Sequence, residues 1–210
     1  ILTAGNEINR EFTKLDEHIM SANFNEKHDF KFGSFEPSLK LGGYGEYRSR
    51  KYKTRQFIYS WDMEENTLPA DFRKMDMTEL LSNSDYFGND KLYLLEEQCM
   101  RNNYNGNNLL GAGYMAASLP FGKFNIYAGL RFEYNQMELI TNLRDDIESH
   151  HSRYYRNRDL FPSINSVYRI NDKNQVRLTY GKSVNRPEFR EVSPSVYYDF
   201  DLASHVQGNV

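Results

Sequence analysis

The chain has 210 residues, which is enough for one large β domain or two small ones with a buried core. Its net charge of -3 and its pI near 6.0 provide no general field for nucleic acid, so nucleic-acid binding is excluded. The mean hydropathy is -0.77 and no apolar run approaches the ~20 residues of a membrane-spanning helix, which excludes a helical membrane protein.

The composition is compatible with a β-barrel membrane protein. Aromatic residues make up 15% of the chain, and β-barrel strands need apolar residues only at alternate positions. Cys99 is the single cysteine, so an intrachain disulfide and a paired-cysteine metal site are excluded. The first residues lack the basic and apolar regions of a signal peptide, which predicts either a protein that is not exported or an interior piece of a longer one.

The first part of the chain predicts strands joined by polar stretches. Residues 1–27 are mixed and give a weak indication of one strand. Residues 38–47 alternate between apolar and polar side chains, which is typical of a strand with two different faces. Residues 48–54 indicate a polar connection before a second, aromatic strand at 56–61.

The stretch 62–105 is the longest without clean alternation. Residues 71–75 and 77–81 predict short helical turns, while 91–98 fits either a helix or a strand. A connection of this length inside a compact domain is more often functional than idle, so we expect this loop to form a surface that meets solute.

Alternation returns in two long arms at residues 107–119 and 124–139, which flank a short turn at 120–123. Every second residue from Phe124 to Tyr134 is apolar, and the residues between them are mostly polar. At ~3.4 Å per residue, a strand of this length can cross the apolar band of an outer membrane even when tilted.

A second hairpin follows a charged stretch at 142–159 that predicts a loop. Its arms are residues 160–170 and 175–191, and the turn between them, 171–174, consists of Asn, Asp, Lys and Asn, which suit a tight turn.

The parity of these strands assigns side chains to two faces. We expect one face to meet lipid, and its members include Ile126, Leu130, Phe132 and Leu178. We expect the other to line a lumen, where its side chains would contact a plug or a solute, or form a ladder of ion pairs among the Arg and Glu residues, which we favour. Its members include Arg131, Glu133, Arg177 and Thr179.

Strand length decides between two architectures. Outer-membrane barrels have long strands, short turns at one rim and long loops at the other, whereas soluble sandwiches favour strands of ~5 to 6 residues. The sequence therefore predicts an all-β fold of antiparallel up-and-down strands with long loops, an incomplete segment of a transmembrane β-barrel. The alternative is a soluble extracellular β-sandwich that binds carbohydrate through its aromatic residues, and a third reading is a barrel that adheres or assembles others without transport.

Several runs resemble the barrel portion of TonB-dependent outer-membrane receptors, especially those of Bacteroidetes-like bacteria. They are LFPSINSVY at 160–168, QVRLTYGKSVNRPEFRE at 175–191 and YYDFDLASHVQGN at 197–209, together with SLKLGGYGEYRSR at 38–50 and YAGLRFEY at 127–134. The resemblance extends over most of the chain from Ser34 onward.

The resemblance implies a barrel of 22 strands closed around an N-terminal plug, which takes up a scarce nutrient such as siderophore-iron or a glycan. Residues 1–210 contain no recognisable plug, energy-coupling box or closing aromatic strand, so we expect one partial barrel domain of about seven strands. The partners that follow are outer-membrane lipid, the plug of the same parent chain, a TonB-type energy-coupling protein and a small solute.

The densest charged motif of the chain lies within the run 175–191, one of the runs that resemble that family. Two of its residues, Arg186 and Arg190, have the chemistry of bidentate anion ligands. The structural interpretation is favoured: Pro187 stops a strand ladder, and Glu188 or Glu191 pairs with the arginines at the base of a loop. The residues of this motif are Asn185, Arg186, Pro187, Phe189, Arg190 and Glu191.

Other candidate sites are weaker. His150 and His151 lie near Asp145, Asp146 and Glu148, but adjacent histidines point apart on an extended chain, so a solvated loop is favoured over a metal site. The strand-end tyrosines Tyr134, Tyr168 and Tyr180 fit an interfacial belt better than sugar stacking. No nucleophile, base and orienting group follow a recognisable pattern, so we expect neither an enzyme nor a cofactor.

Overall fold

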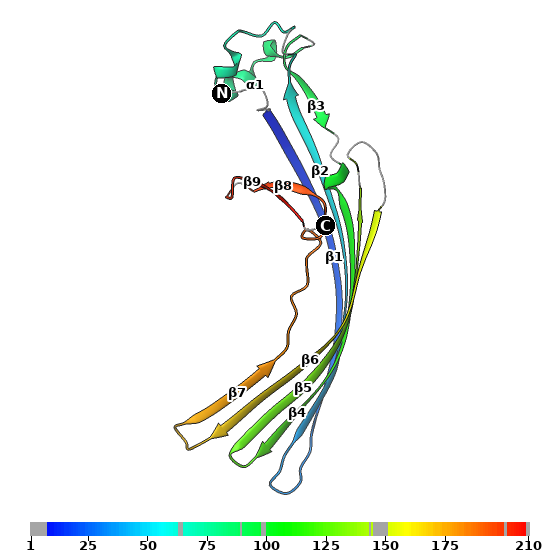
Figure 1. The fold of residues 1–210 in the computed structure, drawn as a ribbon, viewed down its shortest axis with the longest axis vertical. Helices are drawn as coiled ribbons and strands as arrows, with labels where there is room; N and C mark the ends of the chain where they lie inside the picture. The colour runs from blue at the N-terminus through cyan, green and yellow to red at the C-terminus, as the bar shows by residue number, and fades with distance from the viewer. Residues whose placement is uncertain are drawn as a thin grey trace.

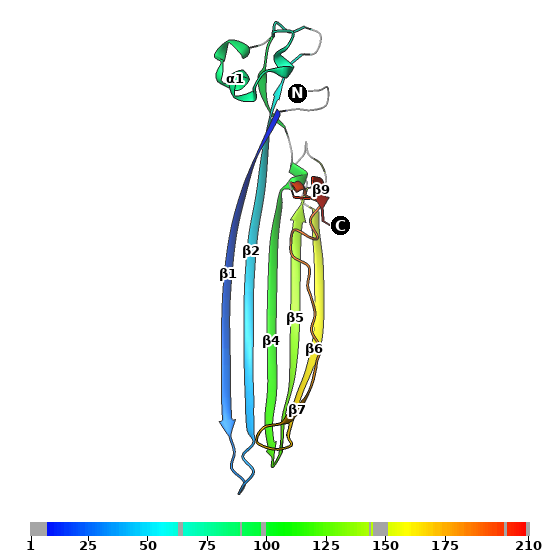
Figure 2. The same ribbon diagram turned by 90° about the vertical axis from the view of Figure 1, so that its left-hand side faces the viewer.

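The computed structural model describes residues 8–62, 65–88, 90–97, 100–142, 144, 151–199 and 201–208. Its main feature is one antiparallel sheet in the order β1-β2-β4-β5-β6-β7, with the short β3 paired to β2 (Figures 1 and 2). The strands are β1 (Ile8–Asp29), β2 (Ser38–Ser60), β3 (Tyr93–Glu97), β4 (Tyr104–Phe121), β5 (Phe124–Thr141), β6 (His151–Arg169) and β7 (Gln175–Gly181). The predicted all-β, antiparallel up-and-down fold is confirmed.

The sheet curls into part of a barrel wall, and the chain after β7 returns through its hollow (Figure 1). There it forms a two-stranded sheet of β8 (Val196–Asp199) and β9 (Ser204–Gln207). Each long strand pairs with its neighbour along most of its length, so the backbone ladder satisfies the N–H and C=O groups that lipid cannot.

Two predicted connections are wrong. Residues 48–54, expected to be a polar connection, lie inside the continuous strand β2, and half of the expected loop 142–159 is strand, because β6 begins at His151. In both places the strand has polar or charged residues on both faces, so the alternation that marks a strand by sequence is absent although the backbone ladder continues.

Short turns gather at one end of the sheet. Gly122 makes the β4–β5 turn with a φ of 56°, a left-handed conformation that glycine adopts without strain. The predicted turn 171–174 is confirmed: the N–H of Ile170 donates to the carbonyl of Asn174 at 3.0 Å. At the other end lie the long connections between β2 and β4 and between β5 and β6 (Figure 1). Outer-membrane barrels place short turns at the periplasmic rim and long loops outside the cell.

The long connection 61–103 contains a small unit of its own. Leu68, Phe72, Leu80 and Leu92 form its buried cluster. The predicted helical turns are present, and the ambiguous segment 91–98 contains strand β3. The helical elements are η1 (Phe72–Lys74), α1 (Met77–Ser82), η2 (Ser84–Tyr86) and, nearer β4, η3 (Met100–Asn102).

Asp76 caps the N-terminus of helix α1. The Thr78 backbone N–H donates to the Asp76 carboxylate at 2.8 Å, which lowers the pKa of that carboxyl. No helix among the described residues is both long and apolar enough to cross a membrane.

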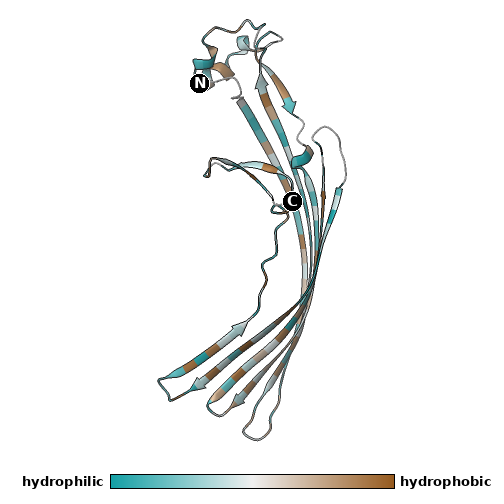
Figure 3. Ribbon diagram, in the orientation of Figure 1, coloured by the Kyte–Doolittle hydropathy of each residue, from teal (hydrophilic) through white to brown (hydrophobic). Residues whose placement is uncertain are grey.

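The two faces of the sheet differ in chemistry. The residues that contact the returning chain face the hollow, and Arg48, Gly106 and Glu133 are among them. Because side chains alternate along each strand, the pairing registers then assign the other side chains of the sheet to the concave or the convex face. By these registers the opposite, convex face bears a band of apolar side chains. Figure 3 shows the hydrophobic residues alternating with hydrophilic ones along the strands in the half of the sheet near the short turns. Leu130, Phe132 and Leu178 belong to this band and stay exposed in the isolated chain, as side chains that meet lipid would.

This apolar band runs obliquely across the ladders. Its centre on β1 is Ala22, which lies in the same hydrogen-bonded row as Tyr134, while its centre on β7, Leu178, lies in the row of Ile126. The shift is eight residues, or ~27 Å, over five strand spacings, or ~24 Å, so the strands tilt about 45° from the normal of the band. On β5 the band extends from Phe124 to Tyr134, ~34 Å along the strand, which at this tilt is about 24 Å and matches the ~25 Å apolar band of outer-membrane barrels.

An arginine on the convex face should therefore destabilise the barrel much more than one on the concave face. In the full-length parent protein, we expect Leu130→Arg to lower the free energy of unfolding from lipid by roughly 2–4 kcal/mol and Thr179→Arg by less than ~1 kcal/mol, measured by urea titration in vesicles. Thr179 is the matched control because its side chain is exposed on the concave face, whereas at Gly129 a Cβ would lie only 3.1 Å from Ser163 Oγ. Equal losses in the two variants would contradict the assignment of faces.

Candidate functional site

The candidate site lies where the chain after β7 crosses the concave face. We call residues 182–195 the inner segment. Its first anchor is Arg186, which donates to Glu133 on β5 at 2.7 Å and to Asp159 on β6 at 2.9 Å. Glu133 also accepts from Arg131 on its own strand at 2.6 Å and is only 11% exposed, so a half-buried ladder of ion pairs ties the inner segment to two strands.

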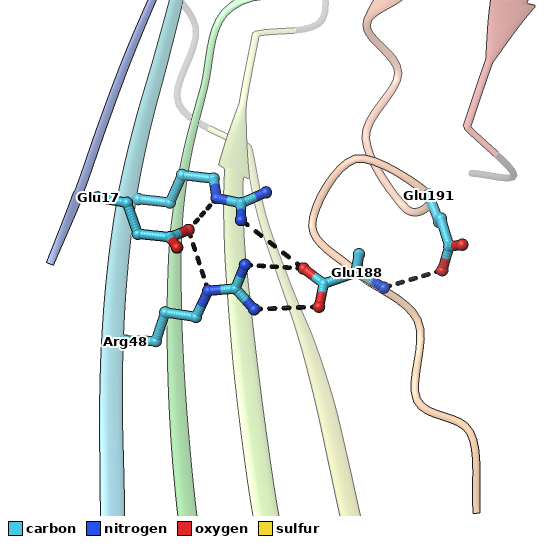
Figure 4. Close-up of polar contacts among 5 residues, drawn as sticks. Glu17, Arg48, Glu188 and Glu191 are labelled. Atoms are coloured by element: carbon cyan, nitrogen blue, oxygen red, sulfur yellow. Dashed lines mark hydrogen bonds and ion pairs between the residues drawn. The ribbon is translucent and has the colours of Figure 1, made fainter. Parts of the chain in front are cut away.

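The second anchor is Glu188, which pairs with β2 (Figure 4). Its carboxylate accepts from two nitrogens of Arg48, at 3.1 and 2.9 Å, and lies 3.8 Å from Arg50. Both arginines also bind Glu17 on β1. The network therefore joins the inner segment to two neighbouring strands, and the Glu188 backbone N–H donates to the Glu191 carboxylate at 2.9 Å, which closes a tight loop within the segment.

Between these anchors Phe189 inserts into the wall. Its ring is 1% exposed and packs against Tyr104, Met137 and Leu139. The ring lies over Gly106 on β4, where a Cβ would meet it at 2.5 Å, so only glycine leaves room for this contact. The guanidinium groups of Arg48 and Arg50 each lie 5.4 Å from the ring centroid.

After Phe189 the chain is held by a cation–π contact and a hydrogen bond from its backbone. Arg190 lies over the ring of Tyr197 at 3.4 Å from its centroid, and the Val196 backbone N–H donates to Asn102 at 3.0 Å. Gly208 packs against backbone carbonyls of residues 190–193. The β8–β9 hairpin is thereby held against the start of β4.

A groove of about 320 Å³ remains between the inner segment and the wall. Three asparagines from adjacent strands, Asn108, Asn135 and Asn157, line it together with Arg48 and Arg186. Asn135 donates to Asn108 at 2.8 Å. Amide donors and acceptors beside two guanidinium groups, over a floor of Leu110, Met137 and Phe189, suit a small polar or anionic solute.

The structure brings together only some of the predicted site residues. Arg131 and Glu133 face the hollow and join Arg186 in one ladder. Arg177 and Thr179 face the same side but lie on β7, where they pair with Val167 and Asn165 near the short turns. Ile126, Leu130, Phe132 and Leu178 lie on the convex face, and their contact with lipid stays a prediction.

Contrary to the prediction from sequence, the acidic residues of the charged motif pair with groups other than the arginines of that motif. Glu188 and Glu191 were expected to pair with the arginines of their own motif, whereas Glu188 pairs with β2, Arg186 with β5 and β6, and Glu191 with a backbone N–H. Pro187 lies beyond the end of β7 and stops no ladder, since β7 ends at Gly181; Asn185 precedes it in the same extended stretch.

Sequence reasoning missed the partners of this motif, Glu17, Arg48 and Arg50. The alternation of two arginines with tyrosines in YGEYRSRKY was the available signal. In the predicted histidine loop, His150, Asp145, Asp146 and Glu148 lie outside the described residues, while His151 opens β6. In the part of the chain that the structure describes, no three metal-ligating side chains gather.

A tilted antiparallel wall with an apolar convex band and a charged concave face defines the class: part of a transmembrane β-barrel. A family model described as the outer membrane protein beta-barrel family matches residues 21–210. The chain belongs to this family, and its location is the bacterial outer membrane. A comparison with curated proteins gives no match. The outer-membrane location and the fold of the long strands into one curved sheet set aside the soluble carbohydrate-binding sandwich.

Filling the space under Phe189 should release the inner segment. We expect Gly106→Ala to destabilise the docked segment by roughly 1–3 kcal/mol, because the new methyl group overlaps the Phe189 ring. In the full-length parent, this appears as faster protease cleavage within residues 182–195. The matched control is Gly111→Ala on the same strand, where nothing lies within 4 Å of the added atom. Unchanged cleavage in Gly106→Ala would show that Phe189 does not hold the segment.

Proposed function

We propose that this chain is part of the barrel of a TonB-dependent outer-membrane receptor that takes up a scarce nutrient, such as siderophore-iron or a glycan. The observation that carries the proposal is a curved wall whose concave face is charged and holds the inner segment (Figure 1). Barrels of about eight strands fill their interior with side chains, whereas barrels of about 22 strands hold a plug in their lumen. A wall whose hollow holds a further stretch of chain fits the wide class.

The two ends of the concave face support two roles. Near the short turns, Arg177 and Thr179 are exposed toward the lumen, where a plug from the same parent chain would contact them. Near the long loops, the groove beside Arg48 and Arg186 opens on the extracellular half, where a solute arrives. A TonB-type energy-coupling protein acts through the plug rather than through this wall. We propose no catalytic role and no cofactor for the chain.

The proposal is tested with strains that carry or lack the parent gene, by measuring which solutes each strain removes from its growth medium. Cells with the gene, cells that lack it and cells that lack the energy-coupling protein are grown in the same medium, and the solutes that remain are compared by mass spectrometry. We expect the solutes left by the gene deletion to form a subset of those left without energy coupling. A parent protein that depletes no solute, or depletes it equally without energy coupling, would favour the barrel that adheres or assembles without transport.

A variant of the groove links that uptake to this chain. We expect Asn157→Trp to slow uptake several-fold, because the larger side chain fills the groove between β6 and the inner segment. Ser152→Trp on the same strand is the control, since its side chain is exposed on the convex face. Both variants are first checked for equal amounts in the outer membrane and for the same heat-dependent gel shift. Equal uptake by the two variants would exclude the groove from the solute path.

A further inference from the structure

Two arginines stand on the convex face of β6 directly beyond the apolar band. Arg158 and Arg156 share the parity of Leu160 and Ile164, and both are exposed. Leu160 is the last apolar outward residue of β6 before them, so the face changes from apolar to cationic within one step of the pleat.

Their side chains reach one layer of the membrane. At ~3.4 Å per residue and a tilt of about 45°, Arg158 lies ~5 Å beyond Leu160 along the membrane normal and Arg156 ~10 Å. The polar headgroup layer adds roughly 5–7 Å to each side of the hydrocarbon core, so Arg158 lies within this layer. Arg156 lies just beyond it, where a long arginine side chain can reach back to the same level. Since both residues lie toward the long loops, this is the extracellular leaflet.

Neither guanidinium group is occupied by an acidic partner among the residues that the structure describes. Arg158 lies over the ring of Tyr134 at 5.9 Å, and Arg156 over that of Tyr154 at 5.6 Å. Glu138 on β5 accepts the Tyr154 hydroxyl at 2.6 Å. By contrast, the arginines of the concave ladder, Arg131 and Arg186, pair with carboxylates.

We propose that Arg156 and Arg158 bind the phosphate group of a lipid of the outer leaflet. A guanidinium group offers two parallel N–H donors that match phosphate oxygens, and two such groups on alternate residues of one strand present their donors side by side. The ring of Tyr134 under Arg158 fits the interfacial level, where aromatic side chains anchor a barrel. The site requires the outer-membrane location but does not require that the barrel transports a solute.

The test uses the full-length parent protein in a nonionic detergent, with phosphorylated lipid A as the probe and its dephosphorylated form as the comparison. Bound lipid is measured by native mass spectrometry. We expect Arg156→Gln combined with Arg158→Gln to weaken binding of phosphorylated lipid A at least ~10-fold, since two charge-assisted phosphate contacts are lost. Arg156→Lys combined with Arg158→Lys, which keeps the charge but loses the fork, should fall between the two.

The matched control removes the same charge from the other face and the other end: Arg169→Gln combined with Arg177→Gln, both toward the lumen near the short turns. We expect its lipid binding to stay within about twofold of the unmodified protein. Three results would each overturn the proposal. In the first, the Gln variant of Arg156 and Arg158 binds phosphorylated lipid A as tightly as the unmodified protein does. In the second, the unmodified protein binds dephosphorylated lipid A as tightly as the phosphorylated form. In the third, the control variant loses as much binding as the Gln variant of Arg156 and Arg158. The heat-dependent gel shift of every variant shows that the barrel is folded, and single substitutions serve if a double variant does not fold.

Discussion

The rest of this structure depends on one constraint: a backbone that crosses lipid must satisfy its own hydrogen bonds. The chain does so with paired antiparallel strands of up to 23 residues, and side chains are then free to divide between two faces. The same constraint applies at the edge of the wall. Within the described residues, β1 pairs on one side only, and in lipid such an edge needs a further strand to satisfy its backbone groups.

The inner segment follows a different rule, because it lines the lumen rather than the lipid. Irregular backbone is tolerated at membrane depth only inside protein or beside water, and the segment lies along the charged concave face. It is held by ion pairs to β2, β5 and β6 and by one deeply inserted ring. The ion pairs are partly exposed, so they contribute less to stability than to position, whereas Phe189 over Gly106 supplies the apolar contact.

The sequence predicted the strands well inside the apolar band and poorly at their ends, for one physical reason. Within the band one face is apolar and the other polar, so a period of two is visible, and Phe124 to Tyr134 displays it. Beyond the band both faces carry polar residues, the contrast disappears, and the sequence of residues 48–54 and 151–159 predicts loops although the ladder continues through them. The anchors of the site were invisible for another reason: Glu188 and Arg48 are 140 residues apart, and nothing local indicates their pairing.

The tilt of the band adds an argument that is independent of family resemblance. A flat sheet would carry its apolar residues straight across the hydrogen-bonded rows, whereas here the band shifts by eight residues from β1 to β7. Such a stagger is what closure of a barrel imposes on its strands. The concave face is then divided along its height: the inner segment occupies the half near the long loops, and Arg177 and Thr179 remain open near the short turns. Under the proposed function, a plug would occupy the half near the short turns, where the wall is open, and would lie below the docked segment.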